Sequence, residues 1–129
     1  MPFVNFKQYI TQDINNTPTL IFGSEFNCIL DSIILSNKTN SKIIASLYIL
    51  REVDKDKATE CTLANKIVLE PNSLLDILES ATLTLEAGDL LYAYSDFSEN
   101  VFNSFISYRE LIELGGENDR AKDGSRKAS

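Results

Sequence analysis

Between residues 82 and 112 the sequence alternates short apolar runs with residues that reverse the chain. The runs are rich in β-branched and aromatic residues, which favour strands. Gly88 lies between the first two runs, and glycine takes positive φ angles without steric cost, so a tight turn is expected there. Asp89 follows it and is expected to accept hydrogen bonds from backbone N–H groups of the turn. The pattern predicts three antiparallel strands that form a meander on which the other strands pack.

Similar runs occur through the rest of the chain. Residues 3–14 alternate loosely, as a half-buried first strand or arm would, and residues 26–36 are apolar enough for a central strand that is partly buried on both faces. Residues 42–50 place apolar side chains on both faces, which predicts a strand at the centre of a sheet or at an interface. Eight or nine short strands without a long helix predict an all-β fold, an antiparallel β-sandwich that is jelly-roll-like.

Two segments are less regular. Residues 74–78 fit the spacing of a helix as well as that of a strand, and a strand is favoured because so short a run makes no stable helix. Residues 51–60 are the most charged internal segment and are expected to be an exposed loop. A turn is expected at residues 70–73, between two strands.

The 129-residue length suits one domain. We expect residues 1–114 to form the β-sandwich, with residues 1–16 as its N-terminal strand or arm. Residues 115–129 form a polar C-terminal tail without an apolar residue larger than alanine. Alone, such a segment buries too little surface to offset the entropy of ordering it, so a neighbouring subunit is expected to hold it in place.

The formal net charge of -7 argues against nucleic-acid and membrane partners, because phosphate groups and anionic lipid surfaces repel an acidic protein. The first seven residues lack the pattern of a signal peptide, and no apolar run approaches the ~20 residues that span a bilayer. Cys28 and Cys61 are expected to be buried, reduced thiols of a protein assembled in a cytosol. A disulfide between the two predicted strands is the alternative.

The residues for most enzyme chemistry are missing. The chain has no histidine, which removes imidazole bases and histidine-containing metal sites, and it has no glycine-rich phosphate loop. We expect no cofactor, and an enzyme using carboxylates or lysines is the least favoured class. Asp54, Asp56 and Glu60 resemble part of a calcium loop, but the glycine and the other ligands are absent, so a solvated loop is the favoured interpretation.

Tyrosines give one binding hypothesis. Tyr48, Tyr92, Tyr94 and Tyr108 lie in predicted strands and could form a stacking platform for a sugar. Because the chain has no tryptophan, ordinary strand aromatics are the favoured interpretation.

The order of several short segments resembles a family of small virion proteins of tailed bacteriophages, common in marine phages. The resemblance covers about residues 5–112 and rests on structural motifs; it departs at Pro71 and Asn72, where glycine is usual. The matching segments are Asn5-Phe6-Lys7-Gln8-Tyr9, Ile33-Ile34-Leu35-Ser36-Asn37, Ser46-Leu47-Tyr48-Ile49, Leu69-Glu70-Pro71-Asn72-Ser73-Leu74, Leu83-Thr84-Leu85-Glu86-Ala87-Gly88-Asp89 and Ser104-Phe105-Ile106-Ser107-Tyr108-Arg109-Glu110.

This resemblance implies a non-enzymatic structural protein of the virion, assembled in the host cytoplasm, that decorates the capsid or attaches at the neck or tail. Its partners would be other virion proteins and copies of itself. The alternative is a carbohydrate- or receptor-binding module of a phage tail, with a glycan as its ligand. The candidate interface residues are Phe3, Phe6, Tyr9, Ile44, Tyr48, Leu50, Tyr92, Tyr94, Arg120 and Arg126.

Overall fold

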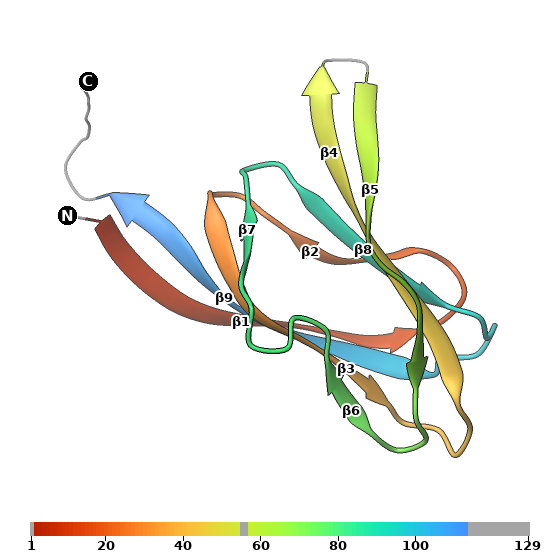
Figure 1. Cartoon of the computed structure of the whole chain (residues 1–129). Coiled ribbons are helices and arrows are strands. Elements are labelled where there is room, and N and C mark those ends of the chain that lie inside the picture. The colour runs from red at the N-terminus through yellow and green to blue at the C-terminus, as the bar shows by residue number, and fades with distance from the viewer. Residues whose placement is uncertain (1, 55–56, 114–129) are drawn as a thin grey trace.

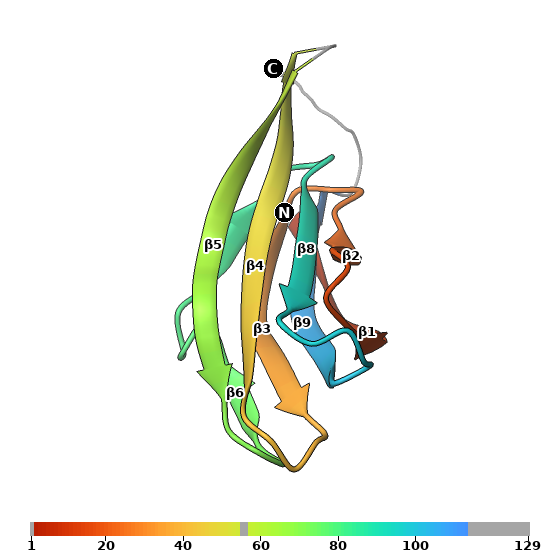
Figure 2. The same cartoon turned by 90° about the vertical axis from the view of Figure 1, so that its right-hand side faces the viewer.

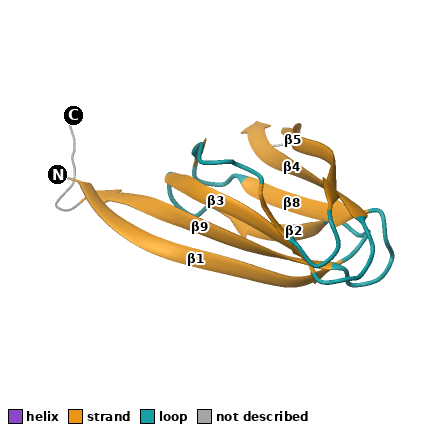
Figure 3. Cartoon of the chain, turned by 60° about the horizontal axis from the view of Figure 1, so that its bottom comes forward, coloured by secondary structure: helices purple, strands orange, loops and turns teal. Residues whose placement is uncertain are grey.

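The computed structural model describes residues 2–54 and 57–113, which form two antiparallel sheets packed face to face (Figure 1). Figure 3 shows only strands and loops in this part of the chain, so it holds no helix that could cross a membrane. The strands are β1 (Pro2–Ile14), β2 (Thr19–Gly23), β3 (Cys28–Asn37), β4 (Ile43–Asp54), β5 (Lys57–Leu69), β6 (Leu74–Asp76), β7 (Leu83–Leu85), β8 (Leu90–Ser95) and β9 (Phe102–Glu113).

The order of the strands is that of a jelly roll. One sheet, sheet A, has the order β1-β9-β3-β6, and β7 also pairs with β3. The other, sheet B, has the order β2-β8-β4-β5. Its strands face the viewer in Figure 2. Because β1, β2, β3 and β4 alternate between the sheets, and β8 and β9 do so again, the chain winds around a shared core. The predicted all-β, jelly-roll-like sandwich is confirmed.

The predicted meander over residues 82–112 is wrong, although its three strands exist as β7, β8 and β9. None of the three pairs with another: β7 pairs with β3, β8 lies between β2 and β4, and β9 lies between β1 and β3. Apolar alternation locates a strand but carries no information about its partner. Here the chain crosses from one sheet to the other between successive strands, so their apolar side chains meet between the two sheets. The strands of a meander all stay in one sheet.

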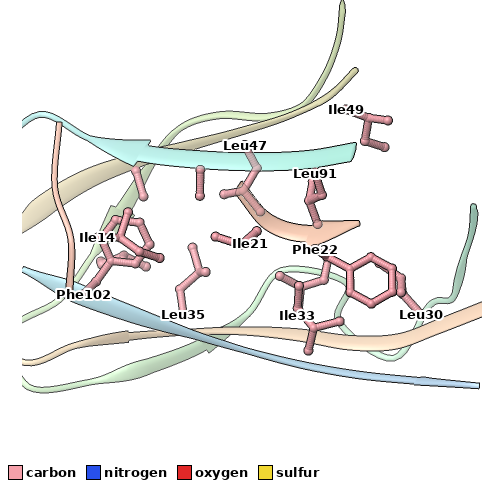
Figure 4. Packing of buried hydrophobic residues seen from close by; sticks show 14 of the residues in the cluster. Ile14, Ile21, Phe22, Leu30, Ile33, Leu35, Leu47, Ile49, Leu91 and Phe102 are labelled. Carbon is pink, nitrogen blue, oxygen red and sulfur yellow. The ribbon is translucent and has the colours of Figure 1, made fainter. Parts of the chain in front are cut away.

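The core lies between the two sheets and follows the alternation of the strands. In β4, Ile43, Ala45, Leu47 and Ile49 point inward and are buried. The strand lies between β8 and β5, as its two apolar faces predicted. In Figure 4, Phe102 and Ile14 fill one end of the core, and Phe22 and Leu30 fill the other.

Strand β3 is central, as expected, but only one of its faces is fully buried. Cys28, Leu30, Ile33 and Leu35 are buried in the core, whereas the side chains that alternate with them are half-buried. The favoured strand interpretation of residues 74–78 is confirmed for β6, Leu74–Asp76, which pairs with β3, whereas residues 77 and 78 lie in a turn. The expected turn at residues 70–73 contains Asn72 with a φ of 53°.

Residues 51–60 are not the expected loop. Strand β4 continues to Asp54 and β5 begins at Lys57, and the two pair as a hairpin that projects beyond the rest of sheet B (Figure 1). Exposed charged side chains are compatible with a strand when no second sheet covers either face. Residues 55 and 56 lie outside the described part of the chain.

The two cysteines also differ from the expectation. Cys28 is buried, but Cys61 is exposed on β5, the outermost strand of sheet B, where no neighbouring strand shields it. Both thiols are free, and the two residues belong to different sheets.

Asn37 is a buried polar side chain at the end of β3 and has a structural role. The Asn37 amide donates to the carbonyl oxygens of Ser41 (2.8 Å), Leu69 (3.1 Å) and Glu70 (3.0 Å). Its side-chain oxygen accepts from the Thr39 N–H at 2.9 Å. Asn37 therefore ties the β3–β4 connection to the β5–β6 turn.

The turn between β7 and β8 is the corner at which the chain passes from sheet A to sheet B. Gly88 has a φ of 96°, as its sequence context predicted, and its N–H donates to the Ser24 carbonyl at 2.7 Å. The Asp89 carboxylate accepts the Glu86 N–H at 2.8 Å, so the expected backbone contact is confirmed. The Ser24 N–H donates to the Asp89 carbonyl at 3.0 Å, which joins this corner to the β2–β3 connection.

The two glycines near this corner give a paired prediction. Gly88→Ala is expected to lower the free energy of unfolding by about 1–2 kcal/mol, because a Cβ is strained at this φ even though no atom lies within 4 Å of it. Gly23→Ala is the control: its Cβ would meet Leu90 at an ordinary 3.5 Å, so we expect no loss of stability. Urea unfolding of both variants measures the difference, and equal losses would contradict the assignment of strain to Gly88.

Candidate functional site

The outward face of sheet B carries large apolar side chains from all four strands. In the register, Tyr48 of β4 lies opposite Tyr92 of β8, and Tyr92 in turn lies opposite Leu20 of β2. The residues of this surface, here called the tyrosine face, are Leu20, Ile44, Tyr48, Leu50, Val68, Leu90, Tyr92 and Tyr94. Each is exposed or half-buried, whereas the alternate residues of β4 and β8 point into the core.

Three rings lie at the centre of this face. The Tyr48 and Tyr92 rings are stacked, with centroids 5.3 Å apart and an interplanar angle of 11°. The Tyr94 ring is tilted by 60° to that of Tyr48, at 6.4 Å. Burial among these rings raises the pKa of Tyr48, with a smaller contribution from the Glu60 carboxylate, so its hydroxyl stays neutral at physiological pH. The centre of the face is thus apolar and uncharged, with hydroxyl groups for hydrogen bonding.

The stacking limits what the tyrosines offer to a sugar. A sugar ring packs against an aromatic face, and in the Tyr48–Tyr92 pair each ring already uses one face against the other. The tyrosines therefore lie together, as the platform hypothesis requires, but as a packed cluster.

A shallow hollow of about 230 Å³ lies at one end of the tyrosine face, lined by Ile44, Ser46, Lys66, Tyr94 and Asp96 among others. The Asp96 carboxylate accepts the Ile44 N–H at 2.9 Å, which closes the connection after β8 against β4. This hollow is smaller than most small-molecule sites, which measure about 300–1,000 Å³. It suits a single side chain of a partner protein better than a cofactor.

The candidate interface residues separate into three groups. Ile44, Tyr48, Leu50, Tyr92 and Tyr94 come together on the tyrosine face. Tyr9 belongs to β1, where its ring meets that of Phe22 edge-on at 6.1 Å. Phe3 and Phe6 lie in β1, but their side chains are outside the described part, as are Arg120 and Arg126.

Three residues of the face were not among the candidates. Leu20 and Val68 are exposed, at 41% and 48%, and Leu90 is half-buried. Each lies in a strand next to inward-pointing neighbours, but the face of an apolar residue cannot be assigned until its strand has a partner. The apolar character of these three residues was therefore visible in the sequence, but placing them on this face required the pairing of their strands.

A second hollow, of about 240 Å³, lies between β1, β9 and the β2–β3 connection. In it the Lys7 ammonium lies 3.0 Å from the Glu110 carboxylate, and this hydrogen bond raises the pKa of Lys7. Burial raises the pKa of Cys28, which also lines the hollow, so its thiol is protonated and a poor nucleophile. Burial likewise raises the pKa of Tyr108. None of these groups is activated for nucleophilic chemistry.

No cluster of three metal-binding side chains occurs in residues 2–54 and 57–113. Of the three residues resembling a calcium loop, Asp56 lies outside this range, and Glu60 lies on the exposed edge strand β5.

The topology defines the chain as a two-sheet jelly-roll sandwich, and its structural neighbours share that architecture. A chain of the Bacillus endospore appendages, which form disulfide-linked pili, superposes on 88% of this chain and 92% of its own with a TM-score of 0.54. A chain in the structure of infectious bursal disease virus, Gx strain, superposes on 91% of this chain with a TM-score of 0.53. This chain spans only 34% of that viral chain.

Sequence identity is 11% in both superpositions, so these likenesses show the fold alone. No model of a protein family matches the sequence, and no curated protein does.

Proposed function

We propose that the chain is a non-enzymatic structural protein of a bacteriophage virion, which docks on other virion proteins as a capsid decoration or a neck or tail attachment. The tyrosine face is the observation that carries the proposal. The sandwich has a closed core of its own, and yet sheet B presents a second apolar surface across all four of its strands. Contiguous exposed apolar surface of this kind marks sites of protein association.

The composition of the face suits such a contact. Specific interfaces bury about 800 Å² per partner and have an apolar centre, enriched in tyrosine and depleted in charge, within a polar rim. Tyr48, Tyr92 and Tyr94 supply that centre, and Lys66 and Asp96 lie beside it. The order of motifs shared with small tailed-phage virion proteins supports the same proposal, as does a fold found in chains of a virus and of a pilus.

The proposal is tested in virions of the phage that encodes the chain. Tyr48→Glu and Leu20→Glu each place a carboxylate on the tyrosine face, and burying it in an interface costs several kcal/mol. We expect at least a tenfold lower copy number per virion, measured by quantitative mass spectrometry. Thr84→Glu is the matched control, because Thr84 is exposed on β7 of the other sheet, and its copy number should not change.

Thermal unfolding of the three variants shows whether a lower copy number results from weaker docking or from a loss of folding. A wild-type chain absent from purified virions would refute the virion assignment. Wild-type incorporation of both tyrosine-face variants would instead refute the role of this face.

A further inference from the structure

The hollow between β1, β9 and the β2–β3 connection is lined by aromatic rings. The rings of Tyr9 and Tyr108 both meet that of Phe22 edge-on, with centroids 6.1 and 4.7 Å away. Tyr9 and Phe26, which also line the hollow, remain 45% and 47% exposed, so aromatic surface is open to a ligand. The volume of about 240 Å³ is below that of most small-molecule sites and suits one side chain of a protein.

The charged groups of the hollow leave it negative. The Glu110 side chain is only 10% exposed, and one of its carboxylate oxygens lies 3.0 Å from the Lys7 ammonium. Glu25 lines the same hollow, is exposed, and forms no ion pair with a residue in the ranges 2–54 and 57–113. Two carboxylates therefore face one ammonium group, whose side chain is 48% exposed. Carboxylates beside open aromatic rings favour a guanidinium or ammonium group as ligand.

The C-terminal tail, residues 114–129, is the part of the chain whose charge complements this hollow. The tail lies outside the described residues, and it carries four basic and three acidic residues. Residues 1–113 carry eight basic and sixteen acidic residues. The body is thus acidic by eight charges and the tail is basic by one, so the body attracts the basic groups of the tail.

The tail also starts close to the hollow. Strand β9 runs from Glu110, which lines the hollow, to Glu113, and three residues of strand span about 10 Å. Gly115 and Gly116 follow, and glycine allows the chain to reverse there. A return over the same distance takes about as many residues, so Arg120 is the first basic residue that can come back to the level of the hollow.

The short tether favours the chain's own tail over the tail of a second copy. Arg120 follows Glu110 by only ten residues, and a tether of this length gives an effective concentration in the millimolar range. At micromolar protein concentration the tail of a second copy is far more dilute and loses this competition. The contact within one chain therefore forms even when its intrinsic dissociation constant is millimolar.

We propose that the tail folds back on its own chain and places the Arg120 side chain in the hollow, between Glu25 and Glu110. The guanidinium donates hydrogen bonds to these two carboxylates and lies against the exposed ring of Tyr9. This inference goes beyond the proposed function and does not depend on it, because a tail docked in the hollow leaves the tyrosine face open to other proteins. A neighbouring subunit that holds the tail is the alternative that the experiments test.

Carbodiimide cross-linking of the full-length chain tests the contact. The reagent joins a lysine amine to a carboxylate that it touches, so the conservative variant Arg120→Lys allows the proposed ion pair to become a covalent amide. We expect mass spectrometry to find residue 120 joined to Glu25 or Glu110. The control carboxylate is Glu79, which is exposed in the turn after β6 and is expected to give no link to residue 120. The pair of Lys7 and Glu110 is the positive control.

Isotope labelling shows whether the link lies within one chain. Labelled and unlabelled Arg120→Lys chains are mixed in equal amounts at micromolar concentration before the reagent is added. We expect every cross-linked pair of peptides that contains residue 120 to be fully labelled or fully unlabelled. A neighbour that holds the tail would instead give pairs with one labelled and one unlabelled peptide.

Limited trypsin digestion of full-length variants tests the charges, because cleavage follows the fraction of tails that is released. With the wild-type tail, Glu25→Lys is expected to raise the rate of the first cut within residues 120–127 at least threefold. With an Arg120→Glu tail, Glu25→Lys is expected to lower the rate, since the swapped charges attract again. With an Arg126→Glu tail, the matched control, Glu25→Lys is expected to act as it does in the wild type. Each comparison uses identical tails, and circular dichroism checks that all variants fold.

Mixed isotope pairs would overturn the fold-back and assign the tail to a neighbour, and links of residue 120 to Glu79 as frequent as those to Glu25 would overturn the site. The site would also fail if Glu25→Lys changed the cleavage rate equally for all three tails. Neither measurement uses virions, so the copy number per virion decides the proposed function separately.

Discussion

Phe102→Ala is expected to lower the free energy of unfolding by about 4 kcal/mol, because it removes a fully buried aromatic ring and leaves a cavity. Phe102 lies opposite Ile14 of β1 and Asn37 of β3, so its ring fills the core where three strands of sheet A meet (Figure 4). This loss is a large fraction of the free energy of unfolding, which is about 5–15 kcal/mol for such a domain. Since each kcal/mol lowers the midpoint of thermal unfolding by a few degrees, we expect the midpoint to fall by roughly 12 °C.

Phe97→Ala is the matched control for this change. Phe97 lies five residues earlier, in the β8–β9 connection, and is 37% exposed. Its truncation removes less buried surface and leaves little cavity, so we expect a loss of about 1 kcal/mol. Denaturant unfolding of both variants gives the two free energies, and equal losses would show that the core does not close around Phe102.

Asp89→Asn is expected to destabilise the chain by about 2 kcal/mol at neutral pH. The Asp89 carboxylate is buried and receives two hydrogen bonds from the Arg51 guanidinium, at 2.8 and 2.6 Å, together with that of the Glu86 N–H. An amide has one acceptor atom for these donors and turns N–H groups toward the others. The loss stays below the 3–5 kcal/mol of a fully buried pair, because the Arg51 side chain reaches water.

The same carboxylate makes this contribution depend on pH. The hydrogen bonds from Arg51 hold the pKa of Asp89 below its usual value, so the folded chain binds a proton less readily than the unfolded chain. The stabilisation is therefore complete above about pH 4 and is lost as the pH falls through the folded pKa. We expect the difference between wild type and Asp89→Asn to shrink below pH 4.

Glu86→Gln provides the control for Asp89. The Glu86 carboxylate also approaches Arg51, at 3.7 Å, but its side chain is 69% exposed. Such surface pairs contribute little, so we expect a change in the free energy of unfolding below about 0.5 kcal/mol. A Glu86→Gln effect as large as that of Asp89→Asn would show that charge near Arg51, not the buried geometry, is what matters.

Local features of the fold could be predicted from the sequence, because each depends on a few neighbouring residues. Alternation put Ile43 and Leu47 on one face of a strand and Tyr48 on the other, and the structure buries the first face. The backbone freedom of Gly88 located a turn, although not the change of sheet that occurs there, and the oxygen of Asp89 identified one of the hydrogen bonds of the turn.

Strand partners could not be predicted in the same way, because pairing depends on residues that are far apart in the sequence. The error at residues 82–112 arose because adjacent strands were expected to pair, whereas Leu90 and Phe102 begin strands of different sheets. The exposed charges of residues 51–60 suggested a loop because a projecting hairpin has no covering sheet to impose an apolar face. For the candidate site, the sequence named the tyrosines of β4 and β8, which lie together on one face, but Leu20 and Val68 required the register.

The position of β9 between β1 and β3 has a consequence for the order of events during synthesis. The ribosome makes β1 first, yet its hydrogen-bonding partner among the described strands is the last to emerge. Until then, both strands that will flank β9 have open backbone groups, and the nascent chain is a receptor for a strand of another molecule. Long-range closure of this kind is slow and exposes chains to exchange. The emergence of β9 is therefore the step that decides whether sheet A is completed by its own chain or by a neighbour's.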